Sequence, residues 1–148
     1  MRTPLPIGIV GGMSPESTVT YYQRIIRKHY EEFGDHTYPR IVLASVSFQE
    51  YIDWQHSGDW ETIARGLQRE FDSLAAAGAR IAGLATNTMH KVLPQIDCPI
   101  RILSIMEAIS NHARERGISR VAVTGTKFTM SDGFYASGLS ERGLKVSV

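Results

Sequence analysis

The sequence contains a single cysteine, Cys98, among its 148 residues. One cysteine cannot form an intramolecular disulfide, and there is no CxxC pair to hold a metal or to carry out thiol–disulfide exchange. Low cysteine content is typical of proteins from reducing compartments, so we expect a cytoplasmic protein. We interpret Cys98, which lies between Asp97 and Pro99, as a structural thiol.

The sequence also has no large excess of positive or of negative charge. Sixteen Lys and Arg residues balance fifteen Asp and Glu residues, which gives a formal net charge of +1. Such a balance does not predict a nucleic-acid partner or an acidic disordered tail. No apolar run is long enough to span a membrane, and the first residues lack the apolar stretch of a signal peptide. The five histidines have no metal-binding spacing, so no metal site is predicted.

Short apolar runs alternate instead with amphipathic segments. We predict strands at residues 6–10, 40–46, 80–85, 99–103, 119–124 and 144–148. We predict helices at about 15–33, 59–77, from 87 to before 94, 104–116 and 131–142, and a loop with one helical turn at 47–54. Strands that alternate with helices predict an α/β fold with a doubly wound parallel sheet. The length allows one domain, or one domain and part of another.

Three loops follow predicted strands and precede predicted helices, at residues 11–14, 86–88 and 125–127. Ligands of such sheets bind outside the carboxyl ends of the strands, and free N–H groups at helix N-termini attract anions. The first loop has neither the lysine of a phosphate-binding loop nor GxGxxG spacing, so a nucleotide is not predicted. It is either a tight strand-to-helix turn or a site for a small carboxylate.

The second loop, Thr86-Asn87-Thr88, carries two hydroxyls and one amide directly after a buried strand. These groups, together with helix N–H groups, could clamp a carboxylate and an ammonium. The alternative is that Asn87 or Thr86 only caps the following helix. His90 lies one turn into that helix, where a lone histidine is more often a packed or surface residue than a catalyst.

Three segments resemble signatures of the aspartate/glutamate racemases. They are residues 7–18 followed by Tyr21-Tyr22, residues 86–92 and residues 123–130. The segments occur in the family's order and extend over the whole chain. The sequence is especially similar to the broad-specificity amino-acid racemases that carry a Thr-Asn-Thr motif.

This resemblance implies a racemase that needs no cofactor and binds its substrate between two pseudosymmetric α/β lobes. One residue from each lobe faces the substrate α-carbon, and in most members both residues are cysteines. The first position corresponds to Thr86 here, and the second lies in a Gly-Cys-Thr-Glu type segment that this chain does not contain. Cys98 is not a substitute, because it precedes the last strand of the first lobe. By this resemblance we expect a truncated chain that could be inactive alone.

The resemblance also implies roles for individual residues. Thr86 would be the acid/base on one face of an aspartate-like or glutamate-like substrate. A threonine hydroxyl is a far weaker acid than a thiol, so it would donate a proton more readily than accept one, and one enantiomer would be preferred. The expected substrate-binding residues are Met13, Ser14, Gln49, Asn87, Thr88 and Thr126, with Gln49 the weaker candidate at the side-chain end.

We expect residues 1–117 to form the N-terminal lobe, with strand order 2-1-3-4, and residues 118–148 to form the first β-α-β unit of a second lobe. That unit could instead join the edge of the first sheet, or pair with another copy. The resemblance also implies a homodimer, because members of the family commonly form homodimers. The alternative functions are a non-catalytic module that binds small carboxylates or a partner, and decarboxylation or isomerisation of related diacids.

Overall fold

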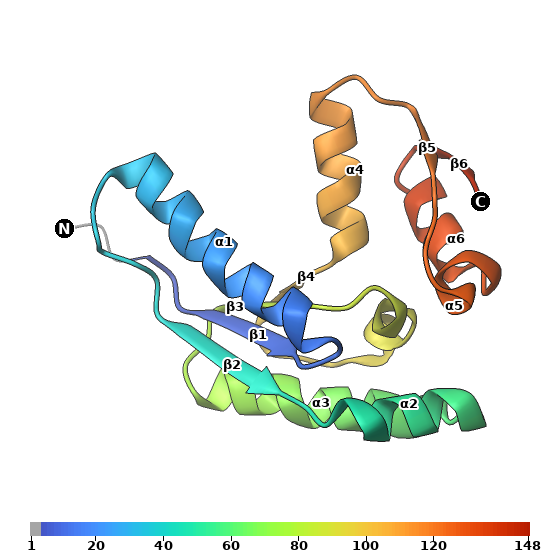
Figure 1. Cartoon of the computed structure of the whole chain (residues 1–148), viewed down its shortest axis with the longest axis horizontal. Helices are drawn as coiled ribbons and strands as arrows, with labels where there is room; N and C mark the ends of the chain where they lie inside the picture. Colours follow the sequence, from blue (N-terminus) through green and yellow to red (C-terminus); the bar gives the residue numbers. More distant parts are fainter. Residues whose placement is uncertain (1–3) are drawn as a thin grey trace.

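A computed structural model describes residues 4–148, which form two parallel sheets (Figure 1). The larger sheet has the strand order β2-β1-β3-β4, which confirms the predicted order, and β5 pairs with β6 in a second sheet. The elements are β1 (Ile7–Gly11), α1 (Pro15–Phe33), β2 (Ile41–Ser45), α2 (Phe48–Ser57), α3 (Trp60–Ala76), β3 (Ile81–Leu84), the 3₁₀ helix η1 (Thr88–Gln95), β4 (Arg101–Leu103), α4 (Ile105–Glu115), β5 (Arg120–Ala122), α5 (Lys127–Ser131), α6 (Phe134–Ser140) and β6 (Lys145–Ser147). In the described part, no helix is long and apolar enough to cross a membrane.

The parallel register of the larger sheet aligns the loops that matter for function. Ile7 of β1 lies opposite Ile41 of β2 and Ile81 of β3. Ile81 in turn lies opposite Arg101 of β4. The carboxyl ends of these strands therefore meet at one edge of the sheet, where the loops after β1 and β3 come together.

Helices cover both faces of the larger sheet, with α1 on one face and α2 and α3 on the other (Figure 1). The core beneath α3 contains Ile63, Leu67, Phe71 and Leu74, all at most 1% exposed. Their steps of three and four residues form the apolar stripe that the sequence predicted. Each such side chain contributes roughly 1.5–3 kcal/mol when it is buried. This core fixes the sheet beneath the candidate site.

The turn between β1 and α1 is held closed by Thr18. Its hydroxyl accepts a hydrogen bond from the Gly12 N–H at 2.9 Å and donates one to the Ser14 carbonyl oxygen at 3.2 Å. Gly12 has a φ of 92°, and a Cβ there would lie 2.6 Å from the Val46 carbonyl oxygen. Glycine is therefore required for this turn to pass close to the chain that leaves β2.

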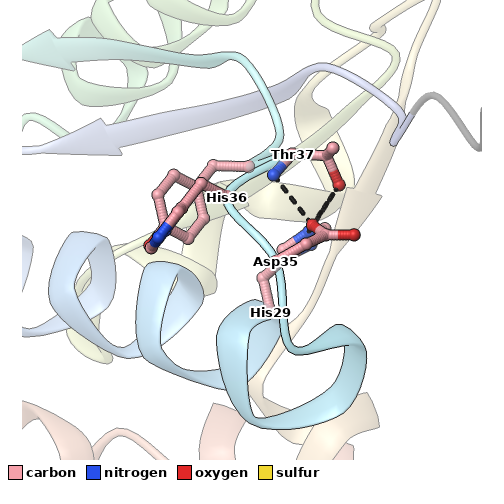
Figure 2. Close-up of polar contacts among 5 residues, drawn as sticks. His29, Asp35, His36 and Thr37 are labelled. Atoms are coloured by element: carbon pink, nitrogen blue, oxygen red, sulfur yellow. Dashed lines mark hydrogen bonds and ion pairs between the residues drawn. The ribbon is translucent and has the colours of Figure 1, made fainter.

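A polar cluster orders the connection from α1 to β2, at the opposite edge of the sheet (Figure 2). Asp35 Oδ1 accepts hydrogen bonds from both the backbone N–H and the hydroxyl of Thr37. Because the Thr37 hydroxyl donates to Asp35, its oxygen accepts from Nε2 of the buried His29, 3.3 Å away. The exposed His36 bonds the Tyr38 hydroxyl. The cluster precedes β2 and is therefore far from the loops that follow the strands.

The prediction of a loop at residues 47–54 was wrong, because helix α2 begins at Phe48 and continues to Ser57. Tyr51 is 2% exposed, and its ring contacts Trp54 with centroids 5.0 Å apart. Most helical stability in proteins comes from packing of an apolar face, and α2 packs against α3. The short stretch shows too little periodicity for this packing to be predicted from sequence.

Two other helices differ from the predicted ones. The helix expected at residues 131–142 is the shorter α6, which begins after Gly133, a residue with a φ of 74°. The separate helix α5 precedes it and was not expected. The helix expected to stop before Pro94 continues through it as a 3₁₀ helix. A 3₁₀ helix bonds residue i to i+3, so its pattern differs from the α-helical pattern that proline interrupts.

Residues 120–147 form a small unit around the second sheet. Arg120 of β5 lies opposite Lys145 of β6, and in the described residues β5 does not extend the larger sheet. The five-stranded alternative is therefore not formed. The core around Leu139 is shared with α4, which contributes Met106 and Ala113. Helix α6 lies so close to α4 that a Cβ on Gly138 would overlap the sulfur of Met106. The expected lobe boundary near residue 117 remains a prediction.

Candidate functional site

A cavity of about 320 Å³ lies at the carboxyl edge of β1 and β3, where the small unit meets the larger sheet. Six of the seven expected substrate-contacting residues line it: Met13, Ser14, Thr86, Asn87, Thr88 and Thr126. The other lining residues are Ser17, Tyr21, Ala85, Ile105, Thr124, Gly125 and Thr129. The structure therefore brings together all three loops that the sequence placed at this edge.

Gln49, the seventh residue, is not among the residues that line the cavity. It lies on the exposed side of α2, where its amide nitrogen donates a hydrogen bond to Asp53 at 2.8 Å. This i,i+4 pair stabilises the helix surface. Its position after the second strand suggested the site, but α2 directs the chain away from the cavity.

The cavity is lined by neutral groups. Its lining side chains include hydroxyls, one amide and apolar groups, and none of them is a carboxylate, lysine, arginine or histidine. The N-termini of α1 and α4 reach the cavity at Ser14 and Ile105. Helix N-termini carry partial positive charge, so a small anion can bind here without a cationic side chain. Across residues 4–148, no cluster of three or more His, Cys, Asp or Glu side chains could hold a metal.

A chain of threonine hydroxyls connects the two parts of the molecule across the cavity. Thr88 and Thr129 are buried, and their hydroxyl oxygens lie 3.5 Å apart. Thr126 Oγ1 lies 3.2 Å from the same Thr129 oxygen and caps the N-terminus of α5. Each hydroxyl can donate one hydrogen bond and accept others, so this chain can adjust to a bound polar group.

Thr86 lies two residues after the end of β3 and is half-buried in the cavity wall. Its hydroxyl has no hydrogen-bond partner anywhere in residues 4–148. The Asn87 side chain, which begins η1, likewise makes no capping hydrogen bond. Neither side chain therefore caps η1, and the Thr86 hydroxyl is available to a ligand.

His90 connects the Thr86 backbone with the start of α4. Its Nδ1 lies 2.7 Å from the Thr86 carbonyl oxygen, and its Nε2 accepts the Ile105 N–H at 3.0 Å. A carbonyl oxygen only accepts, so Nδ1 carries the proton and the imidazole is neutral. Burial lowers the pKa of His90, which is 1% exposed, below its ordinary value, and hydrogen bonds to the Thr86 and Asn87 backbone oppose this shift.

Two tyrosines were not predicted as site residues. Tyr21 lines the cavity, and burial raises the pKa of its phenol. The Tyr135 hydroxyl, from α6, donates a hydrogen bond to Asn87 Oδ1 at 3.0 Å. Tyr21 lies three residues after the end of segment 7–18, the first of the three segments that resemble family signatures. Tyr135 lies 48 residues from Asn87 in sequence, and no local pattern connects the two.

A second contact between the two parts lies beside the cavity. Lys91 of η1 pairs with Asp132 at 2.9 Å, with only 31% and 27% of the side chains exposed. The same ammonium lies 3.9 Å from the centre of the Trp60 ring, which contacts Phe128 edge-on. The α5 segment is therefore held against η1 by charge and by aromatic packing.

Comparisons with known proteins agree with the resemblance. The Asp/Glu/hydantoin racemase family matches residues 10–148. The chain is 37% identical to a candidate Asp/Glu racemase from Yersinia pestis, with a TM-score of 0.92 over 97% of this chain and 64% of that one. It is 35% identical to an aspartate racemase homologue from Pyrococcus horikoshii, with a TM-score of 0.87 over 98% and 64%.

The aspartate racemase of Picrophilus torridus shares the fold at 21% identity, with a TM-score of 0.79 over 97% of this chain and 62% of that one. The chain thus spans about 64% of the length of the first two relatives. The match of the family over residues 10–148, together with the sheet order and the cavity, shows that this chain belongs to the Asp/Glu/hydantoin racemase family.

Proposed function

We propose that the protein inverts the α-carbon of an amino acid such as aspartate or glutamate, without a cofactor. The observation that carries the proposal is the free Thr86 hydroxyl in a small neutral cavity surrounded by hydrogen-bond donors. Family membership supports a racemase-type function. The size of the cavity, about 320 Å³, suits a small molecule of this kind.

In this mechanism Thr86 faces one side of the α-carbon and delivers or removes its proton. Asn87, Thr88 and Thr126 hold the substrate carboxylate or ammonium, and Met13 and Ser14 shape the wall opposite. Removal of the α-proton places negative charge on the carboxylate oxygens. The helix N-termini at Ser14 and Ile105 stabilise that charge, because fixed dipoles aimed at developing charge lower the barrier.

Racemisation needs a second proton-transfer group on the opposite face. No cysteine lines the cavity, because Cys98 lies in a separate groove beside β4. We propose that the second group is not supplied by residues 4–148 of the same chain, and that it comes either from a further segment of the protein or from a second copy in a homodimer. The cytoplasm remains the proposed location.

A second function is favoured by the threonine at the proton-transfer position. A hydroxyl is a poor base compared with a thiolate, so the cavity could bind a small carboxylate without turning it over. Binding without chemistry would still use Asn87, Thr88 and Thr126. The two proposals differ only in whether the α-proton exchanges.

Proton NMR of L-aspartate and L-glutamate in D₂O with the purified chain distinguishes them. Loss of the α-proton signal together with optical inversion supports racemisation. Exchange without inversion shows that only the Thr86 face works. Binding without exchange contradicts turnover by this chain and leaves the carboxylate-binding function.

A further inference from the structure

The groove beside β4 that contains Cys98 is a second cavity, separate from the candidate site, with a volume of about 340 Å³. Residues of η1, β4, α4 and the turn after α6 line it, and six of its ten lining residues are apolar. These six are Leu93, Pro94, Ile96, Ile100, Ile102 and Met106. A hollow of this size, with mostly apolar walls and a few polar groups, is typical of small-molecule sites.

A single cation lies at this groove. Among residues 4–148, Arg142 is the only lining side chain that carries a permanent charge. Its Nη1 donates a hydrogen bond to the Gly138 carbonyl oxygen at 2.7 Å, but the side chain forms no ion pair within the described residues. A guanidinium has several N–H donors in a planar fork that matches a carboxylate. The remaining donors of Arg142 are therefore available to an anion.

His90 lies between this groove and the candidate site. Its imidazole lines the groove and is neutral, because Nδ1 donates to the Thr86 carbonyl oxygen and Nε2 accepts the Ile105 N–H. Ser104 and Met106 also line the groove, whereas Ile105 between them lines the cavity of the candidate site. The two cavities thus share a wall, and a molecule in the groove would lie against the imidazole that holds the Thr86 backbone.

The two cavities suit ligands of different chemistry. The candidate site offers hydroxyls and an amide to a small polar molecule, whereas the groove offers apolar walls and one guanidinium. A free amino acid would bring its ammonium close to the Arg142 guanidinium, which repels it, and against apolar side chains, where an unpaired charge is costly. A molecule with an apolar chain and a single carboxylate is complementary to both features of the groove.

We propose that the groove beside β4 is a binding site for an amphipathic carboxylate, whose apolar chain packs against Leu93, Ile100 and Ile102 and whose carboxylate binds Arg142. This ligand is distinct from the amino-acid substrate, and no side chain of the groove transfers a proton in the proposed mechanism. Binding in the groove therefore does not depend on the racemase function.

Cys98 reports on this groove, because it lines the groove and is the only cysteine in the sequence. The test measures the rate at which iodoacetamide alkylates the full chain at neutral pH, with increasing concentrations of hexanoate, 1-hexanol or hexylamine. The three probes share one aliphatic chain and differ in the charge of the head group. We expect hexanoate to protect Cys98 with a dissociation constant about fivefold lower than that of hexanol, and hexylamine to give the weakest protection.

Three results overturn the proposal. The first is that no probe slows alkylation at tens of millimolar. The second is that hexanol or hexylamine protects Cys98 as well as hexanoate does. The third is that Cys98 of the free folded protein resists iodoacetamide but reacts in denaturant, because another protein segment or a second copy would then cover the groove.

Arg142→Gln removes the charge and should weaken hexanoate binding about fivefold, to the affinity of hexanol, while hexanol binding stays the same. Arg142→Lys keeps the charge and should retain most of the preference for hexanoate. The matched control is Arg116→Gln, at an exposed arginine that ends α4 and does not line the groove, and it should bind all three probes as the wild type does. Wild-type affinity for hexanoate in Arg142→Gln would show that this arginine does not bind the carboxylate.

Discussion

The buried His90 imidazole donates a hydrogen bond to the carbonyl oxygen of Thr86, with 2.7 Å between the two heavy atoms. Its other nitrogen accepts the N–H of Ile105 at the start of α4. One side chain thus fixes the backbone beneath the proposed proton-transfer residue and the helix N-terminus that faces the cavity. Only a neutral histidine with its proton on Nδ1 can make both bonds.

This arrangement predicts a loss of stability in mild acid. Burial lowers the pKa of folded His90 below 6.5, so the unfolded chain binds the proton more readily. The contribution of His90 to stability is complete above about pH 6.5 and is lost as the pH falls through the folded-state pKa. Thermal unfolding of the wild type between about pH 8 and pH 5 should show this decrease.

His90→Gln should be less stable than the wild type by roughly 1–3 kcal/mol at neutral pH, because it leaves a buried backbone group unpaired. The difference between the two proteins should shrink as the pH falls. His56→Gln, at an exposed position on α2, is the control and should follow the wild type. A constant difference across this pH range would contradict the account of His90.

The β1–α1 turn predicts unequal effects of two glycine substitutions. Gly12 and Gly34 both have positive φ, 92° and 69°. A Cβ on Gly34 meets nothing within 4 Å, whereas one on Gly12 meets the Val46 carbonyl oxygen at 2.6 Å. Gly34→Ala should lower the free energy of unfolding by about 1 kcal/mol, because alanine disfavours the left-handed backbone conformation at this position.

Gly12→Ala should lower the free energy of unfolding by about 1–3 kcal/mol more than Gly34→Ala does, because the turn must also move away from Val46. Chemical denaturation of both variants measures the two costs. Equal costs would show that the turn does not pass as close to Val46 as the structure indicates.

The contact of Lys91 with Asp132 and Trp60 predicts that the small unit loosens when this lysine is neutralised. Lys91→Met should lower stability by about 1–2 kcal/mol, since the pair is partly buried and the ammonium also contacts an aromatic ring. Hydrogen exchange should accelerate in α5 and α6 more than in α3. Arg65→Met removes an exposed pair with Glu61 and should change stability by less than about 0.5 kcal/mol. Uniform acceleration along the chain would contradict this account.

Sequence periodicity was sufficient to predict the larger sheet, because its strands and covering helices bury regular apolar faces. Ile63, Leu67, Phe71 and Leu74 form one such face, and the structure buries all four. The Thr86-Asn87-Thr88 loop could be placed at the site for the same reason, since the end of a buried parallel strand fixes its position.

Features that depend on contacts between distant segments could not be predicted. Tyr135 meets Asn87 only because α6 packs against η1 and α4. His90 was expected to be a packed or surface residue rather than a catalyst, and its two backbone partners could not be predicted because they depend on tertiary structure. Gln49 was placed near the site from strand order, and the α2 helix that directs it elsewhere depends on burial of Tyr51.

The central claim is that the Thr86 hydroxyl exchanges the α-proton of the substrate. The measurement that tests it most directly is deuterium incorporation into each enantiomer of aspartate and glutamate by the wild type, Thr86→Ser and Thr86→Ala. Positioned proton transfer contributes about 10²–10⁴-fold, so Thr86→Ala should lose at least about 100-fold in exchange, with succinate binding retained, while Thr86→Ser keeps measurable activity. Wild-type exchange rates in Thr86→Ala would contradict the assignment of Thr86.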